Sequence, residues 1–244
     1  MRAIFILFVT VIHFSWISEG HGKTNRIFVT NEASDTVSVI DIKSEKVIKE
    51  IAVGKRPRGI GISPSRHEIY VAISAENKIA VIDPISLKII RSFACGDDPE
   101  TFSVHGNGNI YISNEEDAKA SVYTPEGVLL AEIEVGIEPE GVAISPNGDT
   151  VIVTSESSNM LHIIDIPSHK IRHNVLVGAR PRSVAFGEVN QIAYATSEIS
   201  SEIRSIDTVN GTTLNKTQLA DSSAKPKDII IIDEKKLAFV AGGR

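Results

Sequence analysis

A short frame built around a proline recurs through the chain and constrains its fold more than any other feature. In "GKRPRGIGISP" (residues 54–64) and "GIEPEGVAISP" (residues 136–146) the pattern G-x-x-P-x-G is kept, while the residues beside the proline change sign. The prolines of this frame recur every 40–45 residues, at Pro57, Pro99, Pro139, Pro181 and Pro226. A period of this length is typical of repeat proteins.

Each period contains four short apolar stretches. In one unit they are Glu140–Ser145, Thr150–Ser155, Met160–Ile166 and Ile171–Gly178, all rich in Val and Ile. Turn sequences such as "PNGD" and "PSHK" separate them, and none shows a helical period of useful length. Four antiparallel strands in every 40–45 residues describe one blade of a β-propeller, so the predicted fold class is all-β.

The number of repeats leaves two arrangements open. The repeats are about 26–68, 69–109, 110–150, 151–191 and 192–236, with a partial repeat at 237–244. Pairing of Lys227–Asp233 with Arg26–Asn31 would close a five-bladed ring and leave Leu237–Ala241 as a tail. The alternative is the front portion of a longer propeller. We favour it because "LAFVA" is in phase with the repeat and would otherwise be an exposed apolar edge.

The first residues differ from the repeats. Arg2 precedes the apolar run Ala3–Ile12, which is typical of a secretory signal and short of the roughly 20 residues that span a membrane. We therefore expect a signal peptide at 1–22 and a propeller domain at 23–244 that is periplasmic or secreted. An uncleaved N-terminal anchor is the alternative.

Composition excludes several classes of partner and cofactor. The net charge of −6 gives no general attraction to nucleic acid, or to a membrane beyond the signal segment. Cys95 is the only cysteine, so a disulfide or a zinc cluster of cysteines is excluded, and we expect it to be a small buried apolar residue. No cofactor is predicted.

Two stretches carry a family resemblance. "IFVTNEASDTVSVID" (Ile27–Asp41) and "SNEEDAKASV" (residues 113–122) resemble the YVTN β-propeller repeat family, especially the periplasmic propellers associated with pyrroloquinoline-quinone (PQQ)-dependent alcohol catabolism. The resemblance extends from Arg26 to the C-terminus. It implies about seven blades and a role beside a periplasmic alcohol oxidation system, with a dehydrogenase or a cytochrome as partner.

The residues beside the proline are the first group of candidate site residues. The frame is expected to join the outer strand of one blade to the inner strand of the next, with a positive φ at its glycine, on the top rim of a central channel. The flanking residues read, in chain order, Arg56/Arg58, Asp98/Glu100, Glu138/Glu140, Arg180/Arg182 and Lys225/Lys227. One interpretation is ion pairing between blades, Arg58 with Glu100 and Glu140 with Arg182. The other is a mouth divided by charge, whose basic sector (Arg180, Arg182, Lys225 and Lys227) holds a small anionic ligand or an acidic partner surface.

Acidic residues at one loop position form the second group. Glu32, Glu115, Glu156 and Glu198 share this position, and Ser74 replaces them in one repeat. We expect their carboxylates to accept backbone N–H groups and to fix the loop. A ring of acids around a cation is the alternative. The extra oxygens and spacing of a calcium loop are missing, so no metal is predicted.

No catalytic residue is predicted. The histidines of the body share no repeat position on the channel side, and G-x-S-x-G is absent from the sequence. The sequence therefore favours a binding or accessory protein that uses its top-face loops. The alternatives are a channel-based enzyme, either a lactonase or other hydrolase or a quinoprotein-like oxidoreductase, and a structural module of a surface layer.

Overall fold

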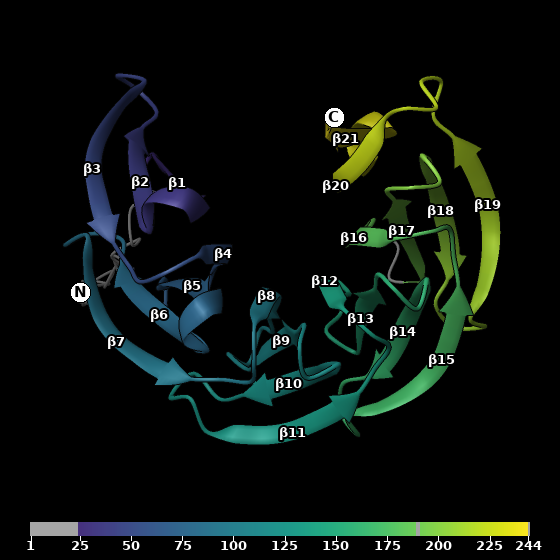
Figure 1. The fold of residues 1–244 in the computed structure, drawn as a ribbon, viewed down its shortest axis with the longest axis horizontal. Helices are drawn as coiled ribbons and strands as arrows, with labels where there is room; N and C mark the ends of the chain where they lie inside the picture. The colour runs from purple at the N-terminus through teal and green to yellow at the C-terminus, as the bar shows by residue number, and fades with distance from the viewer. Residues whose placement is uncertain (1–23, 189–190, 244) are drawn as a thin grey trace, which may run out of the picture.

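Six antiparallel sheets follow one another along the chain in a computed structural model that describes residues 24–188 and 191–243. The sheets stand side by side around a common centre and form an open arc, with the first strand of each complete sheet innermost and the fourth outermost (Figure 1). This confirms the predicted β-propeller architecture. The predicted signal peptide, residues 1–22, lies outside the described residues.

The strands have the following bounds. The first sheet contains β1 (Arg26–Asn31), β2 (Thr36–Asp41) and β3 (Lys46–Ala52). The second contains β4 (Pro57–Ile62), β5 (Ile69–Ile73), β6 (Lys78–Asp83) and β7 (Lys88–Ala94). The third contains β8 (Pro99–Val104), β9 (Ile110–Asn114), β10 (Lys119–Tyr123) and β11 (Leu129–Glu134).

The second half of the arc continues the pattern. The fourth sheet contains β12 (Pro139–Ile144), β13 (Thr150–Ser155), β14 (Met160–Asp165) and β15 (Lys170–Leu176). The fifth contains β16 (Pro181–Phe186), β17 (Ile192–Ser197), β18 (Glu202–Asp207) and β19 (Thr212–Gln218). The sixth contains β20 (Lys225–Ile232) and β21 (Leu237–Gly243).

Short helical turns follow three of these strands. They are η1 (Glu32–Ser34), η2 (Ser74–Glu76) and η3 (Asp233–Lys235). Within the part of the chain that the structure describes, no helix has the length and apolar character needed to cross a membrane.

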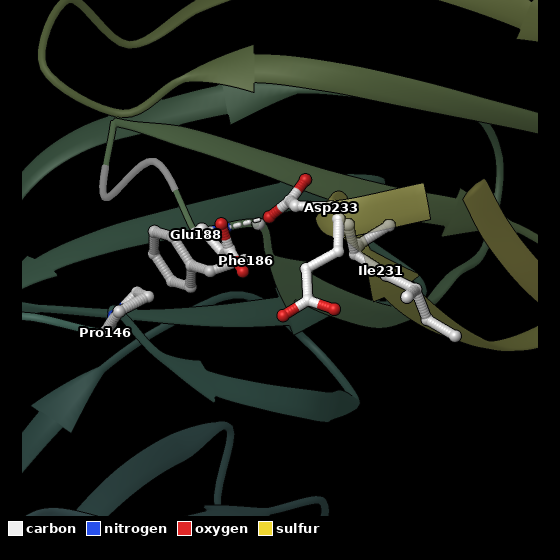
Figure 2. Close-up of a pocket in the computed structure, with 8 residues that line it drawn as sticks. Pro146, Phe186, Glu188, Ile231 and Asp233 are labelled. Atoms are coloured by element: carbon white, nitrogen blue, oxygen red, sulfur yellow. Dashed lines mark hydrogen bonds between the residues drawn. The ribbon is translucent and has the colours of Figure 1, made fainter. Parts of the chain in front are cut away.

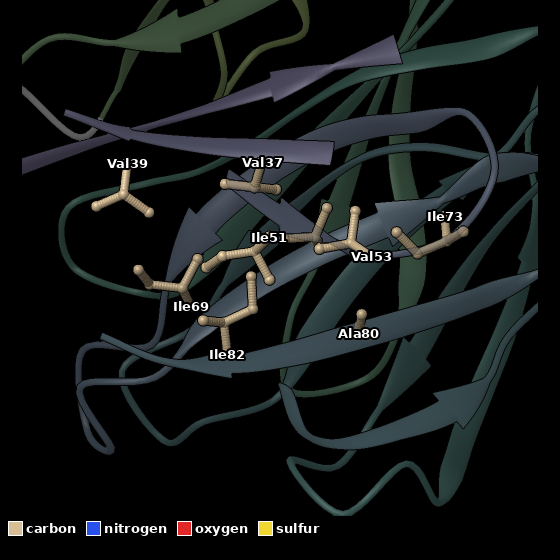
Figure 3. Packing of buried hydrophobic residues seen from close by; sticks show 9 residues of the cluster. Val37, Val39, Ile51, Val53, Ile69, Ile73, Ala80 and Ile82 are labelled. Atoms are coloured by element: carbon tan, nitrogen blue, oxygen red, sulfur yellow. The ribbon is translucent and has the colours of Figure 1, made fainter. Parts of the chain in front are cut away.

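The core lies between neighbouring sheets, because each blade has two apolar faces. Val37 and Val39 of the first sheet pack against Ile69, Ile73 and Ile82 of the second (Figure 3). Every residue of β5 and of β13 is buried, whereas every residue of the outer strand β19 is exposed. Stability therefore depends on the contacts between blades as well as on the hydrogen bonds within them.

The ends of the arc decide between the two arrangements left open by the repeats. β20 pairs with β21 and belongs to a different sheet from β1, so the predicted five-bladed closure through β20 and β1 is absent from the described residues. β21 is the expected first strand of the partial repeat at 237–244. Each sequence repeat contributes three strands to one sheet and the inner strand to the next. A ring of about seven blades stays a prediction.

A β-bulge follows the proline in every inner strand. In the second sheet Pro57 pairs with Ile73, but the next pair is Ile60 with Val71, so Arg58 and Gly59 together face Ala72. Equivalent shifts follow Pro99, Pro139, Pro181 and Pro226. A bulge bends its strand and redirects a side chain, which explains why the residue after the proline reaches the rim.

Polar side chains of the second strand stabilise three of these bulges. Ser113, Thr154 and Thr196 accept hydrogen bonds from the backbone N–H groups of Thr101, Gly141 and Ser183, at 3.1, 2.8 and 3.1 Å. These buried hydroxyls satisfy a donor that the interrupted ladder leaves without a strand partner.

The glycine after the proline is needed for space. A Cβ on Gly141 would lie 2.7 Å from the carbonyl oxygen of Arg182 and 2.9 Å from the Cα of Ser183, both in the next inner strand. Gly59 is equally close to the backbone of Glu100 and Thr101. Glycine at this position therefore lets consecutive inner strands approach one another directly.

The expected positive φ at the first glycine of the frame is found only in part. Gly54 has a φ of +120°, but Gly96, Gly136 and Gly178 do not have a positive φ, and in all four of these turns the residue before the proline is left-handed. Gly136 and Gly178 are instead close to Ser158 and Glu202 of the following loop and strand, where a Cβ would collide. Close approach, more than backbone conformation, therefore requires these glycines.

Replacing Gly141 by alanine tests the close approach. We expect Gly141→Ala to lower the free energy of unfolding by about 1–3 kcal/mol, because the methyl group meets backbone atoms that cannot rotate away. The matched control is Gly106→Ala, since nothing lies within 4 Å of a Cβ there, and its effect should be within about 0.5 kcal/mol. Chemical denaturation measures both, and equal midpoints for the two variants would contradict the close packing of the inner strands.

Candidate functional site

The candidate site is the charged rim formed by the turns that enter the inner strands. The residue before four of the five prolines has a left-handed φ, 60° at Arg56, 50° at Asp98, 55° at Glu138 and 59° at Arg180. The residue after each proline lies in the bulge. Together these two distortions bring both flanking side chains to the same end of the sheets, where the loops carrying the acidic residues also lie.

The first arginine pair connects three sheets. Arg56 Nε lies 3.1 Å and Arg58 Nη1 lies 3.2 Å from Glu32 Oε1, on the loop of the preceding sheet. Toward the following sheet, Arg56 Nη1 lies 3.3 Å from Asp98 Oδ2, and Arg58 Nη2 is in contact with Glu100 Oε2. The predicted pair Arg58–Glu100 is therefore present.

The second arginine pair repeats this arrangement. Arg180 Nε lies 2.7 Å from Glu156 Oε2, and Arg182 Nη1 is in contact with the other oxygen of Glu156. Arg182 Nη2 also lies 2.9 Å from Glu140 Oε1, as predicted. Glu198 Oε2 lies 3.5 Å from Arg180 Nε. Each arginine pair thus bridges carboxylates that belong to different sheets.

These contacts revise two expectations. Of the predicted basic sector, Arg180, Arg182 and Lys227 are already in ion pairs, with Lys227 Nζ 2.7 Å from Glu198 Oε1. The hydrogen-bond donors to Glu32, Glu156 and Glu198 are arginine and lysine side chains, and not the backbone N–H groups that were expected. Their loops are fixed by main-chain bonds, such as those from the N–H groups of Glu156 and Glu198.

One loop departs from the rule that opposite charges meet. Glu32, Glu156 and Glu198 each face an arginine or a lysine of the next turn, and Ser74 donates its hydroxyl to Asp98. Glu115 instead precedes the turn that carries Glu138 and Glu140. Carboxylates therefore gather near the middle of the arc, an arrangement that we did not predict from the order of charges in the sequence.

Burial raises the pKa of two carboxyls in this region. The pKa of Glu100 is raised to about 8, mainly by burial and also by the nearby Glu140 and Glu115, while Arg58 opposes the rise. Burial raises the pKa of Glu140 to about 7, with Arg182 and Arg58 opposing and Glu156 and Glu115 adding to the rise. Both carboxyls therefore hold a proton more strongly than an exposed glutamate does.

A hollow of about 300 Å³ opens beside these carboxyls. Its lining includes Thr30, Glu32, Arg58, Thr101 and Glu140. The threonines do not offer free hydroxyls, since Thr30 Oγ1 donates to the carbonyl of Arg58 and Thr101 Oγ1 to that of Glu140. These bonds join β1 to β4 and β8 to β12, so the lining of the hollow comes from four sheets.

A second hollow of about 420 Å³ lies at the opposite end of the sheets. Figure 2 shows Pro146, Phe186 and Ile231 around it with the carboxylates of Glu188 and Asp233 nearby. The backbone N–H of Glu188 donates to Asp233. The residues that line this hollow include none of the predicted site residues.

The buried histidine and the cysteine have structural roles. His162 accepts the N–H of Gly136 at Nε2 (2.9 Å), and its Nδ1 lies 2.7 Å from Asn174 Oδ1. Burial lowers the pKa of His162, in agreement with a neutral ring inside the sheet. Cys95 packs against the core that contains Tyr123, and burial raises the pKa of its thiol to about 12, so it is a poor nucleophile.

Removing one arginine tests how much the ion pairs of the rim contribute to the free energy of unfolding. We expect Arg182→Met to lower the free energy of unfolding by about 2–4 kcal/mol, because Glu140 and Glu156 would lose a shared partner in a buried position. Lys119→Met is the control, since Lys119 pairs with the exposed Glu132 at 3.5 Å and should cost less than about 1 kcal/mol. Equal unfolding midpoints for the two variants would contradict a buried network.

The raised pKa of Glu100 predicts a pH dependence of stability. Its folded pKa of about 8 lies above the ordinary value of 4.5, so between these values the folded protein keeps a proton that the unfolded chain has released. The stabilising contribution is therefore full below about pH 4.5 and falls as the pH rises toward 8.

Glu100→Gln removes this titration. We expect the difference in free energy of unfolding, wild type minus variant, to decrease by about 1–3 kcal/mol from pH 5 to pH 8 when divalent cations are excluded. Urea denaturation at several pH values measures it. A difference that stays constant, or that increases with pH, would show that Glu100 ionises as an ordinary glutamate.

Comparison with known proteins supports the architecture. No protein-family model matches the sequence, and no curated protein matches it. Among solved structures, hydrazine synthase of Kuenenia stuttgartiensis is similar over 88% of this chain and 70% of that chain, with 19% identity and a TM-score of 0.79. Virginiamycin B lyase from Staphylococcus aureus is similar over 85% of this chain and 71% of that chain, with 19% identity and a TM-score of 0.74. A streptogramin B lyase is similar over 91% of this chain and 74% of that chain, with 15% identity and a TM-score of 0.78. At these identities the similarity establishes the β-propeller fold.

Proposed function

We propose that this protein is a secreted or periplasmic YVTN-type propeller that acts as a binding or accessory module, with the charged rim as its contact surface. The observation that carries the proposal is the ion-pair network itself. Its arginines and carboxylates come from successive sheets, so it forms one continuous surface along the arc, at one end of the sheets.

The outer part of this network remains accessible to a partner. The side chains of Arg56 and Arg180 are 41% and 44% exposed, and that of Glu32 is 51% exposed, while the carboxylates beneath them are buried. A surface with fixed charges of both signs aligns an incoming protein of complementary pattern. Such charges act mainly on the rate and orientation of encounter.

The class of partner follows from the repeat resemblance. The "TNEASDTVSVID" stretch resembles propellers that accompany PQQ-dependent alcohol catabolism, which supports a periplasmic dehydrogenase or its cytochrome as partner. The rim supports a protein partner over a small anion, because the arginines that an anion would need are already neutralised by carboxylates.

Charge reversal at exposed rim positions tests this function. Arg180→Glu combined with Lys225→Glu changes the rim, and both side chains belong to exposed residues. We expect the immobilised variant to capture at least about tenfold less dehydrogenase or cytochrome from the periplasmic extract of its own host, measured at low and at moderate salt.

The matched control carries the same charge change at the other end of the sheets. Lys88→Glu combined with Lys170→Glu alters exposed residues at the starts of β7 and β15. This variant should capture the partner as the wild type does. Equal capture by the rim variant and the control, or loss in both, would contradict binding through the rim.

A further inference from the structure

We propose that Asp98, Glu100 and Glu115 bind a divalent cation of the calcium type at the middle of the rim. The three carboxylates belong to one sheet: Asp98 precedes β8, Glu100 lies in its bulge, and Glu115 follows β9. The sequence predicted no metal, because these residues have no loop spacing in common with known calcium motifs.

The spacing of the oxygen atoms fits such an ion. One oxygen from each carboxylate lies within 4.8 Å of the other two. Calcium binds oxygen at 2.3–2.6 Å, so ligands on opposite sides of one ion are separated by about 5 Å or less. A single cation can therefore contact all three, with water completing its shell.

The state of Glu100 is an independent indication of a missing partner. Its side chain is 1% exposed, and the carboxyl of Glu115 is the only side chain with which it shares a hydrogen bond, one that needs a proton on one of the two acids; neither oxygen has another hydrogen-bond donor. Arg58 Nη2 is in contact with Oε2, but the nearest cationic atom to Oε1 is Arg56 Nη2 at 3.7 Å, beyond hydrogen-bonding distance. When both acids are ionised that shared bond is lost and the buried charge is costly, and a bound cation would compensate it.

The surrounding charges point the same way. The loop acids Glu32, Glu156 and Glu198 each have an arginine or a lysine partner on the next turn. Glu115 instead has other carboxylates as neighbours, since one of its oxygens lies within 4.8 Å of an oxygen of Asp98 and of Glu100. The excess of negative charge is thus confined to the place where the three oxygens converge.

The nearby arginines limit the expected affinity. Arg56 contacts Asp98 and Arg58 contacts Glu100, so two positive charges flank three negative ones. A site with three protein carboxylates and flanking cations belongs with the weak sites of extracellular modules, which have dissociation constants of about 10⁻⁴–10⁻³ M. Calcium at that level saturates such a site only outside the cytoplasm.

Calcium titration of the metal-free protein tests the site. We expect calorimetry at pH 8 to show binding of one Ca²⁺ with a dissociation constant of about 10⁻⁴–10⁻³ M, and Ca²⁺ to raise the unfolding temperature. Mg²⁺ should bind more weakly, because it demands a smaller and more regular shell. Absence of a calcium response up to about 10 mM would overturn the proposal.

A neighbouring glutamate provides the matched control. Glu115→Gln removes one ligand and leaves the contact between Arg58 and Glu100 intact, so it should weaken Ca²⁺ binding at least about tenfold. Glu116→Gln makes the same change at the next, exposed residue and should bind Ca²⁺ as the wild type does. An equal response in the two variants would overturn the proposal. So would a proton shared by Glu100 and Glu115 that no Ca²⁺ concentration displaces.

Discussion

The close approach of successive inner strands is the constraint on which the rest of this structure depends. A blade can bury its two apolar faces only against its neighbours, and the inner ends of the blades must converge more tightly than the outer ends. Gly59 and Gly141 permit that convergence, because their missing Cβ atoms leave room for the backbone of the following inner strand. Thr101 reaches the same neighbour with a hydrogen bond from its hydroxyl. The second residue after the proline is therefore glycine in two repeats and the short polar threonine in another.

The charges on the rim are a consequence of this convergence. The bulge after each proline and the left-handed residue before it place two side chains per turn at the crowded end of the sheets. Acids such as Glu100 and Glu140 become buried there, and burial of an unpaired carboxylate is unfavourable. Arginine meets this need better than lysine, since its planar group contacts carboxylates of two blades at once. The proline frame is therefore retained for its geometry, while the flanking charges follow from what the adjoining blades supply.

Much of the fold could be predicted from the sequence, because the same pattern repeats along the chain. Five copies of one pattern report the same strands independently, so the stretch Thr150–Ser155 was predicted with its observed bounds. The two predicted ion pairs followed from the period, which places Arg58 beside Glu100 and Glu140 beside Arg182. The hydrogen bonds from the bulges to the hydroxyls of Ser113, Thr154 and Thr196 were not predicted, although these residues share one position when the repeats are aligned. The convergence of Asp98, Glu100 and Glu115 was not predictable, because it depends on how a bulge and a loop of one sheet meet in space.

The reach of Arg58 has a consequence for how such arrays change over time. This side chain belongs to the second sheet. It contacts Glu32 of the first sheet and Glu100 of the third, and it lies 3.7 Å from Glu140 of the fourth. Repeats with the same backbone fold therefore fit particular neighbouring repeats, because the charges of a few rim side chains must match. Duplicating, deleting or exchanging a single unit would bring unmatched carboxylates or guanidinium groups together, so the order of the units is itself inherited information.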